Sequence, residues 1–154
     1  MTDTTNVLRD VAREVLADFA FLLTEPAQAP LAWPAAELVR HAAIDFEGPF
    51  SGTLAITSTS ELAETIACDM LGLEAGDPEA VAQSASALGE LANVVAGAVI
   101  ARLFGTSSNC KLGLPQVAHG HPRTDVLPGE VVALEDIEGR PIQIQLRKPA
   151  GVGT

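Results

Sequence analysis

Apolar residues recur along this chain with two different periods, and the change of period divides it into predicted helices and strands. Three segments have the three- and four-residue spacing of amphipathic helices, and they cover residues 6–23, 60–70 and 78–104. Asn6 and Asp77 are suited to cap the first and third helices, because their side chains can accept hydrogen bonds from the first turn. Pro26 and Gly72 follow the first and second helices and are expected to end them. The first helix is expected to bury Val7, Leu8, Val11, Val15, Leu16, Phe19, Leu22 and Leu23.

Elsewhere the apolar residues alternate with polar ones at the two-residue period of half-buried β-strands. The predicted strands cover residues 41–46, 50–57, 110–117, 130–134 and 142–146. Gly48-Pro49 and Glu138-Gly139 are expected to turn two hairpins, and Pro115 is expected to break the third strand. The residues expected to face outward at the last strand are Gln143, Gln145 and Arg147. This order of elements predicts an α+β fold, with long helices packed on one face of an antiparallel sheet.

The length and composition fit a single folded domain over residues 1–154. A chain of 154 residues can bury a sizeable hydrophobic core. An apolar content of 47% with 19% charged residues argues against a disordered chain. Residues 149–154 are expected to form a mobile tail.

The charge balance narrows the choice of partners. The formal net charge is −11 and no basic cluster occurs, which disfavours binding to nucleic acids and to anionic membranes. An acidic surface suits a partner that exposes lysine or arginine. The first residues lack the basic-then-apolar layout of a secretory signal, so we expect the protein in the cytoplasm. The long helix carries Ser86, Glu90, Asn93 and Arg102, which a membrane-spanning helix would rarely contain.

Several other residues have ordinary structural explanations. Cys68 and Cys110 lack the spacing of a metal site or redox pair, so buried reduced thiols are expected. Trp33, in a proline-rich loop, is expected to pack on the core. His119 and His121, with Asp125 close behind, could bind a metal, but a further ligand is lacking and His41 is the only other histidine. The residues expected to be simply solvated carboxylates around a hairpin are Glu130, Glu135, Asp136 and Glu138.

The strongest candidate site lies on the long helix. Ser86, Glu90, Asn93 and Gly97 fall within a few tens of degrees of one another at about 100° per residue, and we call them the 86–97 stripe. One interpretation is an ordinary solvated helix face. However, the flanking residues are mostly Ala, Gly and Val rather than charged, and the small Gly97 would let another molecule approach. The other interpretation is therefore a contact surface.

The chemistry available to this stripe is limited. Glu90 offers a carboxylate that can pair with a cation of a partner. Asn93 offers a donor and an acceptor, which can hold and aim one water molecule without taking its proton. Neither residue is a strong nucleophile, and no histidine or cysteine stands nearby to activate one. The stripe could therefore orient a water molecule toward an electrophile that is already activated.

The spacing Ser86-x3-Glu90-x2-Asn93, followed by Pro115, resembles the active-site pattern of the CheC/CheX/FliY family of chemotaxis phosphatases. The segments 21–26 and 114–120 and the Gly-x-Leu at Gly52 are similar to the CheX-like branch. The connection from Asn93 to Pro115 is one residue shorter than is usual in the family. In the first helix Glu14 is followed three residues later by Ala17 rather than Asn, so one site per chain is expected, as in the CheX branch.

The resemblance implies hydrolysis of the aspartyl phosphate of a CheY-like response regulator in chemotaxis or another two-component pathway. Glu90 would dock to a lysine of the regulator and Asn93 would position the attacking water, with Ser86, Gly97 and Pro115 contacting the partner. The protein would need no cofactor of its own, and Mg²⁺ would be bound by the regulator. The family also implies a homodimer formed through the sheets, with residues 142–146 supplying an edge strand.

Two alternatives to the enzyme stay open at this point. The same fold could serve as a non-catalytic interaction module that binds a signalling or flagellar switch protein through the same helix. A weaker alternative is a small metal-dependent protein that uses His119 and His121.

Overall fold

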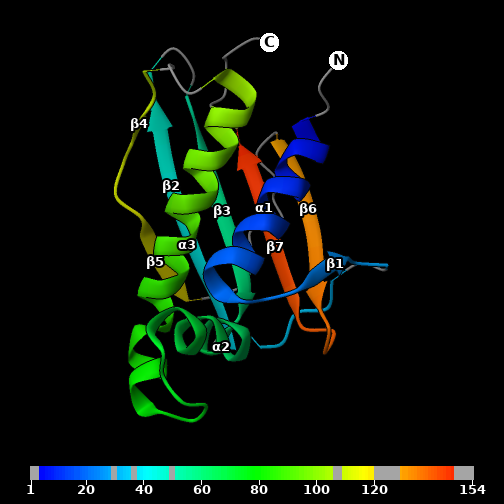
Figure 1. Ribbon diagram of the computed structural model, residues 1–154, viewed down its shortest axis with the longest axis vertical. Helices are drawn as coiled ribbons and strands as arrows, with labels where there is room; N and C mark the ends of the chain where they lie inside the picture. The colour runs from blue at the N-terminus through cyan, green and yellow to red at the C-terminus, as the bar shows by residue number, and fades with distance from the viewer. Residues whose placement is uncertain are drawn as a thin grey trace.

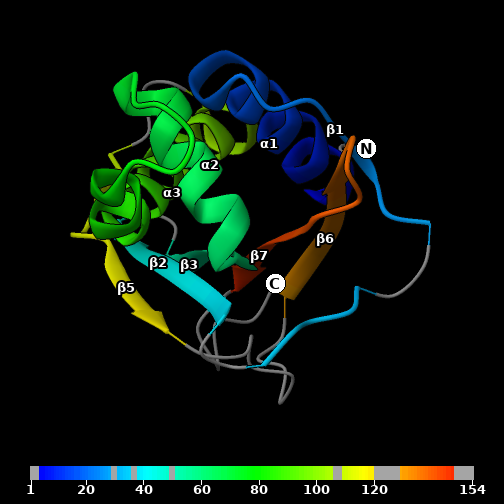
Figure 2. The same ribbon diagram turned by 90° about the horizontal axis from the view of Figure 1, so that it is seen from below.

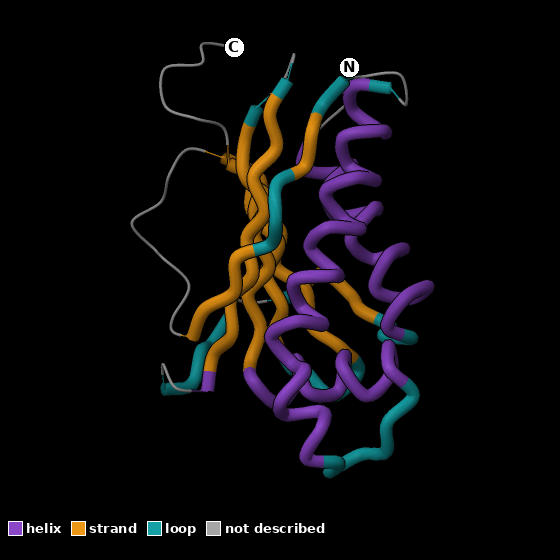
Figure 3. The backbone as a smooth tube through the Cα atoms, turned by 90° about the vertical axis from the view of Figure 1, so that its left-hand side faces the viewer, coloured by secondary structure: helices purple, strands orange, loops and turns teal. Residues whose placement is uncertain are grey.

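Three helices cover one face of a seven-stranded antiparallel sheet (Figures 1 and 3). The computed structural model describes residues 4–28, 31–35, 38–48, 51–105, 109–119 and 129–147. The elements are α1 (Thr4–Ala20), β1 (Thr24–Pro26), β2 (Val39–Glu47), β3 (Gly52–Thr59), α2 (Ser60–Leu71), α3 (Pro78–Phe104), β4 (Lys111–Leu112), β5 (Gln116–His119), β6 (Gly129–Asp136) and β7 (Pro141–Arg147). The predicted α+β arrangement is confirmed. The expected tail over residues 149–154 lies outside the described residues.

The sheet has the strand order β1-β6-β7-β3-β2, and β4 and β5 both pair with the outer side of β2. Figure 2 shows β1 and β5 at opposite edges. β4 pairs near the end of β2 at Phe46, and β5 pairs near its start at Ala42. Between them the Gly113 amide donates to the Asp45 carbonyl at 2.8 Å. The predicted strand over 110–117 is therefore divided into two short strands around Pro115.

The last strand does not lie at an edge. β7 pairs with β3 on one side and with β6 on the other, so the expected free edge at residues 142–146 is wrong. The reason is that the two hairpins, β2–β3 and β6–β7, join through their inner strands. Gln145 alternates away from the core residues Ile144 and Leu146 as predicted, yet it is buried.

α1 ends three residues earlier than its apolar pattern predicts. Phe21 adopts a left-handed conformation with φ +52°, and the Leu22 amide donates to the Leu16 carbonyl at 3.0 Å. The chain then turns into β1, and Phe19 and Leu23, which were expected to be buried, are exposed. At the other end the helix begins before Asn6, whose side chain accepts from Arg9 Nη1 at 2.7 Å instead of capping.

The other helix ends follow the sequence closely. The Thr59 hydroxyl accepts from the Leu62 amide at the start of α2, and Gly72 ends that helix with φ +69°. Asp77 caps α3 by accepting from the Glu79 amide at 2.8 Å. α3 covers the same residues that the pattern predicts, 78–104.

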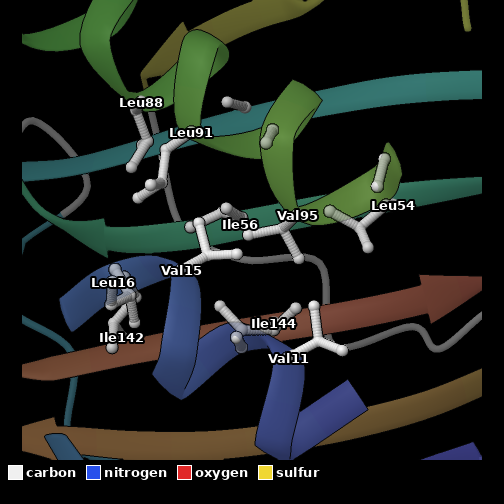
Figure 4. Close-up of a cluster of buried hydrophobic side chains, with 14 of the residues drawn as sticks. Val11, Val15, Leu16, Leu54, Ile56, Leu88, Leu91, Val95, Ile142 and Ile144 are labelled. Carbon is white, nitrogen blue, oxygen red and sulfur yellow. The ribbon is translucent and has the colours of Figure 1, made fainter. Parts of the chain in front are cut away.

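One hydrophobic core fills the space between the helices and the sheet. α1 lies over β6 and β7, and α3 lies over β2 and β3 (Figure 1). The side chains labelled in Figure 4 come from both helices and from the central strands, and they are Val11, Val15, Leu16, Leu54, Ile56, Leu88, Leu91, Val95, Ile142 and Ile144. By length and composition α3 could also span a membrane, but half of its most apolar window is buried inside this fold.

A charged cluster fastens the β6–β7 turn to α2. The Asp136 carboxylate accepts from the backbone amides of Glu138 and Arg140 and from Arg140 Nε, at 2.8–3.0 Å. Arg140 also donates to Thr65 on α2 at 2.9 Å. Burial lowers the pKa of Arg140, but the hydrogen bond and charge of Asp136 outweigh this and raise it. The prediction of a merely solvated carboxylate is therefore wrong for Asp136, whose side chain is 2% exposed.

We expect Asp136→Ala to lower the free energy of unfolding by about 3 kcal/mol, because it leaves a partly buried arginine and two backbone amides without their acceptor. The matched control is Glu138→Ala, which removes another carboxylate that pairs with Arg140 but whose side chain is 68% exposed. That change should cost less than about 1 kcal/mol. Urea denaturation of both variants is the measurement. Equal losses would contradict the structural role assigned to Asp136.

Candidate functional site

The 86–97 stripe runs along the side of α3 that borders solvent. Ser86 and Glu90 are exposed, whereas Asn93 and Gly97 are half-buried. Within the part of the chain that the structure describes, the side chains of Glu90 and Asn93 make no hydrogen bond or ion pair. The carboxylate and the amide are therefore free to interact with another molecule.

The chain segment over residues 111–119, which we call the edge segment, lies beside the stripe. It contains β4 and β5 and packs against α3 as well as β2 (Figure 1). It approaches α3 at Gly89 and Gly97, the positions one turn before and one turn after Asn93. The stripe thus forms a boundary between the open helix surface and the edge of the sheet.

Pro115 lies directly against the turn of α3 that carries Glu90. A Cβ atom built on Gly89 would be 3.1 Å from the Pro115 Cβ and 3.3 Å from the Val117 Cγ1. The absence of a side chain at Gly89 allows this close approach. The structure therefore brings Pro115 against Gly89, the residue that precedes Glu90 of the stripe.

Gly89 is the residue that the sequence analysis missed. A glycine inside an apolar helix costs about 1 kcal/mol relative to alanine, so its presence one residue before Glu90 was an available signal. Helical spacing indicates only Ser86, Glu90, Asn93 and Gly97. It could not reveal which helix position would face a strand that follows much later in the chain.

The surroundings of Gly97 differ from those of Gly89. A Cβ atom at Gly97 would be 3.9 Å from the Leu112 Cδ1, an ordinary van der Waals contact. Part of the space that the sequence analysis assigned to another molecule is therefore occupied by the edge segment itself. A role for Gly97 in partner binding stays a prediction.

The alternative metal site at His119 and His121 stays a prediction, because only part of it falls within the described residues. His41 lies on β2 with its Nδ1 3.0 Å from the Thr57 hydroxyl, while His121 and Asp125 lie outside the described residues. Among the described residues, no group of three or more histidine, cysteine or acidic side chains could hold a metal. Cys68 and Cys110 form no disulfide, and both are half-buried rather than fully buried as expected. Trp33 is half-buried and lines a cavity of about 470 Å³ instead of joining the main core.

Comparison with known proteins assigns the chain to a family. The family model described as chemotaxis phosphatase CheX matches residues 40–131, which is more than half of the chain. The chain belongs to the CheX family. The matched range contains the whole 86–97 stripe, Gly89 and Pro115. No curated protein matches the chain.

Solved structures of CheX proteins share the fold. CheX from Desulfovibrio desulfuricans has a TM-score of 0.71 at 18% identity, covering 96% of this chain and 100% of that protein. CheX from Vibrio vulnificus has a TM-score of 0.69 at 24% identity, with 95% and 97% covered. CheX from Borrelia burgdorferi, solved as a complex of CheX, CheY, BeF3 and Mg²⁺, has a TM-score of 0.69 at 19% identity, with 96% and 100% covered. At these identities the likeness establishes the CheX fold.

The two glycines of α3 in this CheX-family chain should respond differently to alanine. Each substitution removes the helix penalty of glycine, worth up to about 1 kcal/mol. At Gly97 the new methyl group fits, so Gly97→Ala should raise the free energy of unfolding. At Gly89 it meets Pro115 at 3.1 Å, so Gly89→Ala should lose that gain and displace the edge segment. Denaturation curves for the two variants make the comparison, and identical gains would show that Pro115 does not press on Gly89.

Proposed function

We propose that this protein hydrolyses the aspartyl phosphate of a CheY-like response regulator. The observation that carries the proposal is the pair of unpartnered side chains, Glu90 and Asn93, one turn apart on the outer side of α3. Membership of the CheX family of chemotaxis phosphatases supports this assignment. The complex of a CheX relative with CheY supports a regulator of that kind as the partner.

In this proposal Glu90 docks the helix to the regulator. Its exposed carboxylate pairs with a lysine of the partner, forming a charge-assisted hydrogen bond on association. The net charge of −11 would favour approach of a regulator surface that exposes lysine. Glu90 therefore contributes to binding more than to the chemical step.

Asn93 acts on the water molecule. Its amide has no hydrogen-bond partner within the described chain, so its donor and acceptor can hold one water in line with phosphorus. The water oxygen forms the new bond to phosphorus while the bond to the aspartyl oxygen breaks. Inorganic phosphate leaves as the dihydrogen anion with the oxygen and both protons of the water, and the aspartate carboxylate is restored.

The regulator supplies the rest of the active site. It provides the acyl phosphate, the lysine and a bound Mg²⁺, which stabilises charge on the phosphoryl group during transfer. Mg²⁺ is present in the complex of the Borrelia burgdorferi relative with CheY. Ser86, Gly97 and Pro115 contact the docked regulator around the two acting residues. The protein then needs no metal of its own.

The decisive experiment follows phosphate release from a phosphorylated regulator of the same organism at several regulator concentrations. The wild-type protein should accelerate release. Asn93→Ala should lower the maximal rate by about a hundredfold while half-saturation changes little. Glu90→Ala should instead raise the half-saturating concentration by about tenfold. If each regulator tested keeps its phosphate at the uncatalysed rate, the phosphatase proposal fails and a non-catalytic interaction module becomes the better account.

The dependence on ionic strength should further distinguish the role of Glu90 from that of Asn93. A docking contact through Glu90 weakens as salt screens it, so the wild-type half-saturating concentration should rise several-fold between about 50 and 300 mM salt. Glu90→Gln keeps the shape of the side chain without its charge, and its salt dependence should be much flatter. Parallel salt dependences for the wild type and Glu90→Gln would argue against a lysine contact at this position.

Homodimer formation and a cytoplasmic location remain proposals carried over from the family and the sequence. The structure removes only the specific basis for pairing through residues 142–146, because that strand is internal. Sedimentation analysis would test the oligomeric state directly.

A further inference from the structure

We infer that Leu114 is an apolar anchor that inserts into the response regulator beside the Glu90 contact. This inference rests on the proposed function and adds to it a binding determinant outside the helix. Leu114 occupies the break between β4 and β5, next to Pro115. Its residue surface is 87% exposed, more than that of any other large hydrophobic residue in the described ranges.

Exposure of a single leucine is common on protein surfaces, so the position of Leu114 carries the argument. On one side of it, the Gly113 amide donates to the Asp45 carbonyl at 2.8 Å, which fixes the backbone to β2. On the other side, Pro115 packs against Gly89 of α3. The residue is thus held outward on a backbone that is anchored at both neighbours, and little ordering is needed when a partner covers it.

Leu114 is also part of a larger apolar surface. Leu112 and Val117, in the same edge segment, remain 36% and 44% exposed although both approach glycines of α3. The edge segment that carries these residues lies beside α3 at the edge of the sheet (Figure 1). An apolar centre next to charged and polar groups is the usual composition of a specific protein interface.

The molecule that covers this apolar surface can be inferred because the surface is continuous with the 86–97 stripe. Pro115 touches the helix at Gly89, one residue before Glu90, so a molecule that covers Glu90 and Asn93 must also approach the residue beside Pro115. The same regulator therefore contacts both surfaces. We expect it to present an apolar depression close to the lysine that receives Glu90.

The test compares two neutral substitutions at equally exposed apolar positions. Leu114→Ser removes the proposed anchor. Ile137→Ser is the matched control, because Ile137 is 84% exposed in the β6–β7 turn, away from α3. Neither variant adds charge, so electrostatic attraction to the regulator is unchanged. Thermal unfolding should be close to wild type for both, since neither side chain is buried.

Two measurements are made with each variant: phosphate release at several regulator concentrations, and direct binding to the regulator held in its activated form by beryllofluoride and Mg²⁺. Leu114→Ser should raise both the half-saturating concentration and the dissociation constant by about tenfold, with the maximal rate unchanged. Leu114→Met keeps an apolar side chain at this position, so it should bind nearly as tightly as wild type. Ile137→Ser should behave as wild type.

The outcomes distinguish this inference from the proposed function. If wild type accelerates phosphate release and Leu114→Ser has unaltered half-saturation, the anchor is refuted while the phosphatase stands. If Leu114→Ser lowers only the maximal rate, the residue does not act through binding and the anchor is likewise refuted. If wild type binds the activated regulator without accelerating release, and Leu114→Ser binds about tenfold more weakly, the anchor stands and the phosphatase fails.

Discussion

The burial of α3 against β2 and β3 is the constraint on which the other features depend. The helix supplies Leu88, Leu91 and Val95 to the core, so its opposite side is fixed toward solvent. The edge segment packs along the border between these two sides. Residues of the 86–97 stripe are therefore held in place by the same packing that forms the core, and no separate framework positions them.

Most of the helices and strands could be predicted because local signals and tertiary packing agree. α3 has a capping aspartate, a proline in its first turn and a continuous apolar side, and its bounds match the prediction. α1 was predicted too long because Phe19, Leu22 and Leu23 continue the apolar period. The left-handed turn at Phe21 and the pairing of β1 with β6 override that pattern. Strand order could not be predicted either, because alternation assigns faces to a strand and does not name its neighbours.

The same contrast between local signals and long-range contacts applies to the site. The position of Glu90 and Asn93 on one side of α3 could be predicted from spacing, because both lie on one helix and the helical period is local. The approach of Pro115 to Gly89 could not, because it joins residues from separate elements. Likewise, the buried role of Asp136 depends on Arg140 folding back over the turn and reaching α2. Sequence periodicity contains no information about such long-range contacts.

A comparison of α1 with α3 shows how similar spacing can lead to different surfaces. Asp10, Glu14 and Ala17 have the spacing of Ser86, Glu90 and Asn93. Glu14, however, pairs with Arg102 of α3 at 3.2 Å, and the Arg13 side chain donates to the Thr24 carbonyl at 3.0 Å. Arg13 stands where α3 has Gly89, so a long side chain bridges helix and edge strand there. The Glu14 carboxylate of α1 is thus paired with another residue of the same chain.

The central position of β7 has a consequence for how the chain folds. The two hairpins become one sheet only when β3 pairs with β7, in a register that sets Thr53 opposite Arg147. Such a pairing closes a long loop that contains α2 and α3, so its entropic cost is met late and slows folding. During synthesis β2, β3 and α3 emerge before β7. The edge of β3 that pairs with β7 therefore stays unpaired until β7 has been made. During that interval the unpaired edge of β3 is open to pairing with another chain, which is a route to aggregation.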